Sequence, residues 1–444
     1  MSQSINQIAA NHPAPDVTAV SDSQWAQRLE SFASDARMHD DNITLPASAA
    51  AKIGRPMLIV GLLMLLVSAI GIFSISFKHT LAGIEIGLFT VLAISLGSLF
   101  WTMVFHALNA GWSITLRRQF ENLATLVWIP ALCLIAIAII EVVMEGVLLT
   151  WLDPAVQEGN HLLEVKAPYL NAPFFIIRVI FYALCWIALS QLLFRWSRKA
   201  DDTGDRTLGR KARFWSSFGI PVFAFSMTFC AFDFLMSLDY RFFSTMWGVY
   251  FFASCALGSA SAVAIIMALV KSSGRLQGVV TNEHFHDLGK LVFTFVVFWT
   301  YITFSQYFLI WYSNIPEETM WFTARKTMGY NWLFNIMLFG HFAIPFLILI
   351  WRPIKQSPKL LAIMGAYLIV MIALDMAWII LPVLSINNTG AANPSISGHL
   401  ITVASVLSVV MIFGWAFTLK ISKSPLIPTK DPMLHEALKH KNYV

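Results

Sequence analysis

Long apolar runs separated by short polar stretches dominate the chain. The stretch from Asp287 to Thr319 is representative, because it carries no charged residue between Lys290 and Glu317. An uncharged run of this length is typical of a helix that crosses a bilayer core of roughly 30 Å. The same stretch contains the polar patch Ser305–Tyr307, which would be costly on a lipid-facing surface. The pattern therefore predicts a membrane-spanning helix that turns polar side chains toward a protein interior.

Ten segments of this kind are expected, each long enough to span a bilayer. Their approximate bounds are 56–77, 83–107, 123–149, 172–195, 214–237, 243–270, 288–313, 329–351, 359–384 and 396–420. The predicted fold class is all-α: a polytopic membrane protein with about ten transmembrane helices, which form a domain over residues 51–420. Polar residues 1–50 are expected to form a flexible tail, although 25–32 also fit a short amphipathic helix, and 421–444 form a second tail.

The composition supports a membrane protein. Hydrophobic residues make up 57% of the chain and charged residues only 12%, with a mean hydropathy of +0.67. A soluble protein of this length needs far more charge to cover its surface. The net charge of +5 is small and gives no reason to expect nucleic acid as a partner.

The charges in the connecting stretches predict an orientation. Outside the first 50 residues, twenty-two lysines and arginines fall on the side that bears the two tails, whereas the other side has five: Lys78, Lys166, Arg241, Arg325 and Lys326. Positively charged loops stay in the cytoplasm. Both termini are therefore expected to be cytoplasmic. The longer outer connections, 150–171, 314–328 and 385–395, fit either docking loops for a peripheral partner or simple connectors.

Neither haem, nor an iron–sulfur cluster, nor another metal is expected in this chain. The four cysteines are well separated inside apolar runs and form no CxxC pair, so burial as small hydrophobic residues is the simplest interpretation. A haem with two histidine ligands needs both at one depth. His106, His341 and His399 fall at the inner, central and outer levels of their segments.

Ionisable residues within the spans are the main candidates for function, because burying charge in a bilayer is costly. Counted along the helices, Glu141, Glu145, Arg178, Asp233 and Gln306 lie in the outer half, and His341 and Asp375 near the middle. His106 ends the second span on the inner side, where His284, His286 and Asp287 introduce the seventh.

Two interpretations fit Glu141 and Glu145, which are expected one turn apart on one helix face near Arg178. Such a pair resists double ionisation and suits a proton relay or a site for a polar head group. The alternative is a buried ion pair that ties the third and fourth helices together. His341 with Asp375 fits a polar relay at mid-depth.

Aromatic and glycine patterns are less specific. Stripes such as Phe223, Phe225, Phe229, Phe232 and Phe234 fit a slot for a long-chain quinone, but helix packing explains them more simply. Gly83 and Gly87 have the offset of four that lets helices approach closely, and packing is sufficient to explain them.

Three motifs resemble a known family. CAFDFLMSLDYRFFSTMWGVYFF (Cys230–Phe252), FSQYFLIWYSNIPEET (Phe304–Thr319) and APFFIIR (Ala172–Arg178) resemble the ActF-type membrane subunits of bacterial alternative complex III, in the NrfD/PsrC-like family. The resemblance implies two four-helix bundles, helices 2–5 and 6–9, flanked by helices 1 and 10. A pseudo-two-fold axis along the membrane normal would then match Asp233 with Asp375, and Arg178 with His341.

The resemblance also implies a function in the bacterial inner membrane. The complex would oxidise quinol and pass electrons to cytochrome c or an oxidase. Its other members would be a related quinol-binding membrane subunit, an iron–sulfur subunit, haem c subunits and a terminal oxidase. Quinone or quinol is the expected cofactor, with Gln306, Arg178 and Asp233 as candidates for holding its head group.

The resulting hypothesis is a transmembrane proton path in a subunit that is not catalytic alone. The outer part of the path would consist of Glu141, Glu145, Arg178 and Asp233. His341 and Asp375 would continue it through the middle, and His106 with Asp287 would open it to the cytoplasm. Two other classes compete: a stand-alone secondary transporter and a non-catalytic membrane scaffold.

Overall fold

The computed structural model describes residues 21–327, 329–386 and 396–442, and all regular secondary structure in these ranges is helical. Ten helices in the described part of the chain are long and apolar enough to cross a membrane. The predicted class, an all-α multi-pass membrane protein, is confirmed.

Six of the ten spans are single helices and four contain a break or a change of helix type. The spans are α3 (Asp40–Ile43) with α4 (Ala47–Ser74), α5 (Phe77–Ala107), α6 (Ile114–Thr125) with α7 (Trp128–Val143), α10 (Ala172–Thr203), α11 (Thr207–Ala231) with a π-helical segment (Phe232–Met236), α12 (Trp247–Ser272), α13 (Asn282–Ser313), α15 (Asn331–Ile336) with a π-helical segment (Met337–Ala343) and α16 (Ile344–Leu349), α18 (Pro358–Ile380) and α20 (Ile396–Ile421). The shorter helices include α2 (Asp22–Ser34), α8 (Pro154–Gln157), α9 (His161–Lys166), α14 (Pro316–Thr327), α17 (Arg352–Gln356), α19 (Val383–Ile386) and α21 (Leu434–Leu438).

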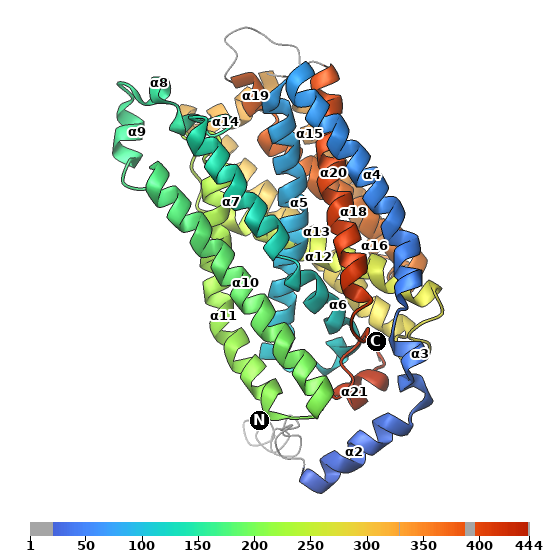
Figure 1. The fold of residues 1–444 in the computed structure, drawn as a ribbon. Coiled ribbons are helices and arrows are strands. Elements are labelled where there is room, and N and C mark those ends of the chain that lie inside the picture. The colour runs from blue at the N-terminus through green and yellow to red at the C-terminus, as the bar shows by residue number, and fades with distance from the viewer. Residues whose placement is uncertain (1–20, 328, 387–395, 443–444) are drawn as a thin grey trace, which may run out of the picture.

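The spans form two four-helix bundles. The first contains α5, α6–α7, α10 and α11, and the second contains α12, α13, α15–α16 and α18 (Figure 1). The two bundles meet along α5 and α12, whose most apolar windows are 89% and 83% buried, against 17% for α4. A Cβ atom on Gly97 of α5 would lie 1.8 Å from the carbonyl oxygen of Cys255 in α12, so the two backbones are in direct contact.

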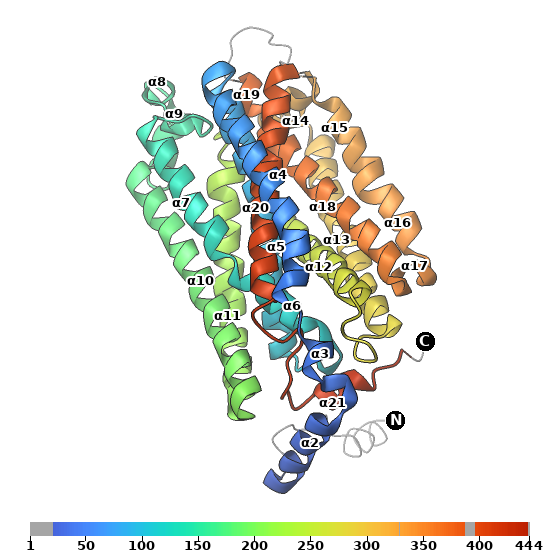
Figure 2. The same cartoon turned by 45° about the vertical axis from the view of Figure 1, so that its right-hand side comes forward.

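The interface between the bundles has a two-fold pattern of contacts. The helix α5 contacts α11 and α18, and its counterpart α12 contacts α18 and α11. The first and tenth spans, α4 and α20, lie outside the two bundles. They pack against each other and together against α5, side by side in Figure 2. Gly83 and Gly87 lie at this contact, where added Cβ atoms would meet Thr402 and Val409 at 2.6 and 3.0 Å, which confirms their packing role.

One end of the molecule, drawn at the bottom in Figure 1 and here called the lower end, carries α2 and α21 (Figure 1). Part of the segment for which a flexible tail was expected is helical: α2 covers residues 25–32, where a short amphipathic helix was the alternative. Trp25 and Phe32 of α2 are buried, and the Trp25 indole donates a hydrogen bond of 3.0 Å to the carbonyl of Gly204. Residues 1–20 lie outside the described residues.

The C-terminal segment is also packed against the lower end of the bundles. The Leu426 amide donates to the carbonyl of Ile43 at 2.7 Å, and Gln119 donates to the carbonyl of Leu426 at 2.7 Å. This cover explains why the third span begins earlier than predicted. All twelve residues of α6 are buried despite its polar sequence, because the C-terminal segment and the neighbouring helices supply partners for its side chains.

The outer connections fold at the opposite, upper end. Residues 150–171 form the short helices α8 and α9, and 314–328 contain α14 (Figure 1). Arg325 of α14 is buried and donates to the carbonyls of Trp378 and Ile379 at 3.2 and 2.9 Å, so it caps the end of α18. Most of the connection 385–395 lies outside the described residues.

Candidate functional site

A buried ion pair in the first bundle joins Arg178 and Asp233. The Arg178 Nε and Nη2 atoms donate to the two Asp233 carboxylate oxygens at 2.9 and 2.8 Å. Arg178 stands on α10, and Asp233 lies in the π-helical segment that ends the α11 span. Such single-turn π segments occur frequently at functional sites. Both residues are buried, at 7% and 0% exposure, so the pair is a two-point ion pair removed from solvent.

The remaining polar capacity of this pair is taken up by its neighbours. The Tyr182 hydroxyl donates to Asp233 at 2.8 Å, and Arg178 Nη1 donates to the carbonyl of Tyr169 at 2.8 Å. The guanidinium also lies over the rings of Tyr169 and Phe174, at 3.9 and 4.4 Å from their centres. The polar groups of Arg178 and Asp233 therefore have hydrogen-bond partners within the protein, and the pair holds α10 and the α11 span together.

The expected pairing of Glu141 with Glu145 is wrong. The helix α7 ends at Val143, Glu145 has a left-handed backbone with φ of 54°, and its side chain is exposed. Glu141 is buried, and its carboxylate accepts hydrogen bonds of 3.1 Å from the amides of Leu148 and Leu149. Glu141 thus fixes the turn after its own helix, and Arg178 has Asp233 as its carboxylate partner.

The first bundle contains a further buried acid, Glu85, which is not among the predicted site residues. Glu85 of α5 is only 2% exposed and lies within a membrane-spanning helix. The signal was present in the sequence, since Glu85 is a lone carboxyl within an apolar run.

Asp375 is the central acid of the second bundle. It is fully buried on α18, and its carboxylate accepts hydrogen bonds from the Tyr250 hydroxyl, from Ser254 Oγ at 3.4 Å and from the Trp299 indole at 3.2 Å. These donors come from α12 and α13. The predicted correspondence with Asp233 therefore does not extend to the bonding partners, because Asp233 is held from α10.

His341 reaches Asp375 only through Trp299. The imidazole of His341 stacks on the indole of Trp299, with ring centroids 3.8 Å apart and planes 20° apart. His341 is fully buried within the π-helical segment of the eighth span, and neither ring nitrogen has a hydrogen-bond partner among the described residues. The predicted pair is thus brought into one cluster, bridged by an aromatic residue and not by a direct hydrogen bond.

Gln306 lies apart from the ion pair with which it was grouped. It stands on α13 of the second bundle, while Arg178 and Asp233 belong to the first. Its side chain is buried, and its Oε1 atom accepts no hydrogen bond from another described residue. The structure therefore does not bring Gln306, Arg178 and Asp233 together as one head-group site.

The aromatic residues divide between packing and outward-facing positions. Phe234, in the π-helical segment that ends the α11 span, contacts Phe89, and Phe89 contacts Phe251, with ring centroids 5.9 and 5.6 Å apart. These rings lie where the two bundles meet. Phe225 and Tyr301, in contrast, are 67% and 64% exposed on the outer surface of the spans. The contacts of the first group favour packing as the role of these buried rings.

The lower end holds the inner group of predicted residues. His106 is buried, and its Nε2 atom lies 3.7 Å from the carboxylate of Glu121. The same carboxylate forms ion pairs with Arg117 at 3.1 Å and Arg118 at 3.0 Å. Glu121 is not among the predicted residues, because it precedes the predicted third span, 123–149. Asp287 is 2.5 Å from His440 of the C-terminal segment. The buried His284 contacts the carbonyl of Ala437 at 3.0 Å, and no described contact joins His106 to Asp287.

No protein-family model matches the chain, and no curated protein matches it. Among the described residues, no group of three or more histidine, cysteine, aspartate or glutamate side chains is arranged to hold a metal ion. The fold and the site together define a class: a multi-pass helical membrane protein with buried polar clusters inside both four-helix bundles.

Proposed function

We propose that the chain is a membrane subunit of a quinol-oxidising respiratory complex and provides a transmembrane proton path. The observation that carries the proposal is the buried group formed by His341, Trp299 and Asp375. An imidazole with two unpartnered nitrogens is expensive to bury in an apolar environment. A water chain or a polar head group beside His341 would supply the missing partners, and either is what a proton path or a quinone site requires.

The first bundle would supply the other end of the path. Glu145 is exposed after the upper end of α7, and Glu141, Glu85 and the Arg178–Asp233 pair are the buried charged groups that the path would use next. His106 and Asp287 would connect the path to the lower side. Because these groups are not in direct contact with one another, water molecules would have to join them.

The motif resemblance supports the biological setting. It suggests an assembly in the bacterial inner membrane with both termini in the cytoplasm. The assembly would include a related quinol-binding membrane subunit, an iron–sulfur subunit, haem c subunits and a terminal oxidase. Quinone is the proposed ligand, and Gln306 and His341 are the candidate residues with unsatisfied polar atoms in the second bundle.

The proposal is tested by replacing Asp375 with Asn in the intact complex and measuring protons moved per electron. The amide keeps acceptor capacity for Trp299 but cannot release a proton as a carboxyl does. A fall in the ratio with normal assembly supports the path. An unchanged ratio in an assembled complex removes the proton role of Asp375.

A membrane scaffold is the second candidate, and the complete hydrogen bonding of Arg178 and Asp233 favours it. A scaffold would copurify with partners yet keep its function after both Asp233→Asn and Asp375→Asn. A secondary transporter would function without partners. Broken helices in matching positions mark many transporters, but the break between α6 and α7 is not repeated in α13, which is continuous from Asn282 to Ser313.

A further inference from the structure

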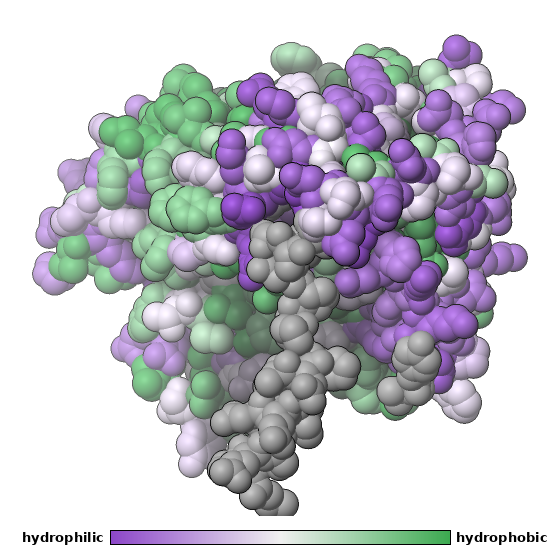
Figure 3. All heavy atoms as spheres, turned by 90° about the horizontal axis from the view of Figure 1, so that it is seen from below, coloured by the Kyte–Doolittle hydropathy of each residue, from purple (hydrophilic) through white to green (hydrophobic). Residues whose placement is uncertain are grey.

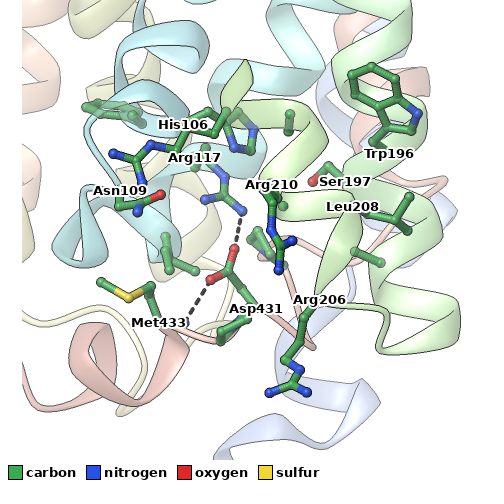
Figure 4. Close-up of a pocket in the computed structure, with 18 of the residues that line it drawn as sticks. His106, Asn109, Arg117, Trp196, Ser197, Arg206, Leu208, Arg210, Asp431 and Met433 are labelled. Atoms are coloured by element: carbon green, nitrogen blue, oxygen red, sulfur yellow. Dashed lines mark hydrogen bonds and ion pairs between the residues drawn. The ribbon is translucent and has the colours of Figure 1, made fainter. Parts of the chain in front are cut away.

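A cavity of about 630 Å³ opens at the lower end of the first bundle (Figure 4). The ends of α5, α6, α10 and α11 enclose it together with the C-terminal segment around Asp431. Apolar side chains form part of its wall, among them Phe105, Ile114, Trp196 and Leu208. Seen from below, hydrophilic residues gather over much of this end of the molecule (Figure 3).

The charged side chains of the cavity are predominantly basic. Five cations line it, against three carboxylates: Arg117, Arg206, Arg210, Arg213 and Lys430, with Asp201, Asp205 and Asp431. Histidine is counted as neutral here. The cavity is therefore suited to an anionic group.

The three carboxylates are already bound to protein donors. Asp431 accepts from Arg117 at 2.5 Å and from the Met433 amide at 2.9 Å. Asp201 pairs with Arg118 and accepts from the Thr429 amide at 2.9 Å. Asp205 accepts from the amide and hydroxyl of Thr207 at 2.8 and 2.9 Å. None of the three is bonded to Arg210 or Arg213.

Two of the cations are accessible to a ligand. Arg210 and Arg213 are exposed, and their guanidinium groups have no hydrogen bond or ion pair with another described residue. Figure 4 shows the Arg210 side chain extending from α11 toward the Arg117–Asp431 pair. Two guanidinium groups one turn apart suit the oxygens of a phosphate group, which arginine binds in a forked geometry.

The surface beside the cavity is suited to lipid. Phe214 and Phe218 continue the helix face of Arg210 at offsets of four and eight, and they are 68% and 58% exposed. Trp215, 39% exposed, contacts Trp196 of the cavity wall with ring centroids 6.4 Å apart. Exposed aromatic rings beside basic residues at the end of a span are typical of the interfacial zone of a membrane.

We infer that this cavity binds the phosphate group of an acidic phospholipid, with Arg210 and Arg213 as its main ligands and the acyl chains along Phe214 and Phe218. Basic pockets between transmembrane helices are known sites for such head groups. A free phosphate would use the same cations but would gain nothing from the aromatic surface. The inference is independent of the proposed proton path.

The full-length protein, delipidated in mild detergent, is mixed with phosphatidylglycerol or with phosphatidylcholine, and bound lipid is counted by native mass spectrometry. The double variant Arg210→Gln/Arg213→Gln is compared with Lys199→Gln/Lys211→Gln. Both remove two positive charges from the same corner, but neither lysine lines the cavity. Circular dichroism and size-exclusion profiles show whether each variant is folded.

We expect phosphatidylglycerol to bind more tightly than phosphatidylcholine, and the arginine variant to weaken it about thirtyfold. Each basic side chain near a membrane surface changes the affinity for acidic lipid roughly fivefold. The lysine variant should change it less than about threefold, because its charges lie outside the cavity and salt screens them from a lipid bound there. Equal weakening in both variants, or equal binding of both lipids, overturns the inference. Displacement of phosphatidylglycerol by millimolar inorganic phosphate also overturns the lipid assignment in favour of a free phosphate.

Discussion

The imidazole of His341 lies flat on the indole of Trp299, with ring centroids 3.8 Å apart, and the same indole donates to Asp375 at 3.2 Å. The stack fixes the histidine ring but leaves its two nitrogens without partners among the described residues. In the first bundle, by contrast, the Arg178–Asp233 pair is bonded on all sides. The second bundle therefore has the polar capacity that a transported proton or a head group would use.

Replacing His341 with Phe distinguishes a role of His341 in proton transfer from a role in packing alone. The phenyl group keeps the stack on Trp299 but removes both nitrogens, so a role in proton transfer would be lost. We expect quinol-linked proton movement in the complex to fall about tenfold or more, as for other proton-transfer side chains. Phe339→Leu is the control, since Phe339 lies in the same π-helical segment but is 60% exposed. Normal proton movement in an assembled His341→Phe complex would argue for packing alone.

Breaking the Arg178–Asp233 pair on one side should cost more than removing it entirely. Asp233→Asn leaves the buried Arg178 charge uncompensated, which typically destabilises a protein by roughly 3–5 kcal/mol. The double variant Arg178→Met/Asp233→Leu should recover most of this loss. Thermal unfolding in detergent measures the difference.

The pair of Asp35 and Arg37 provides the comparison, because Arg37 is 41% exposed and an exposed pair is worth about 0–1 kcal/mol. If Asp233→Asn destabilises no more than Asp35→Asn, the Arg178–Asp233 pair does not hold the two helices together.

The contact between Gly97 and Cys255 predicts a sharp difference between two glycines. A methyl group at Gly97 would lie 1.8 Å from a backbone oxygen of α12, whereas one at Gly209 would meet no atom within 4 Å. We expect Gly97→Ala to separate the bundles locally and cost about 3 kcal/mol or more. Gly209→Ala should be neutral or stabilise α11 by roughly 0.5–1 kcal/mol. Equal unfolding temperatures for the two variants would contradict the close crossing of α5 and α12.

The ten spans could be predicted from the sequence because each corresponds to its own apolar run. The sequence also identified Arg178, Asp233, His341 and Asp375 as buried, since charge within such runs is rare for energetic reasons. It was not sufficient for their partners, which come from distant segments: Arg178 meets Asp233, 55 residues away, and not Glu141 or Glu145.

Two of the errors had different physical causes. The end of α7 had a local signal, because Gly146 directly after Glu145 adopts φ of +87°, a conformation typical of a helix terminus. The burial of α6 had no local signal in the sequence. Its polar side chains are covered by the C-terminal segment, as when Gln119 donates to the carbonyl of Leu426, and no local pattern contains that information.

The start of α11 should depend on pH through Asp205. Hydrogen bonds from the amide and hydroxyl of Thr207 hold the pKa of the Asp205 carboxyl below its usual value of 3.8. A depressed pKa means that the charged form stabilises the folded state, so this contribution is complete above about pH 4. It is lost as the pH falls through the lower pKa of the folded state.

Hydrogen exchange of the amides at the start of α11, corrected for intrinsic rates, measures this contribution. At neutral pH, Asp205→Ala should speed exchange about fivefold, because the local hydrogen bonds from Thr207 that it removes are worth roughly 1 kcal/mol. Asp205→Asn should retain most of the protection and lose its pH dependence, since the amide oxygen still accepts from Thr207 but does not titrate. Asp202→Ala is the control, since Asp202 lies at the same corner but its exposed side chain makes no hydrogen bond to Thr207. Equal exchange in the wild type at pH 6 and at a pH below the folded pKa would show that the Asp205 carboxylate does not order this corner.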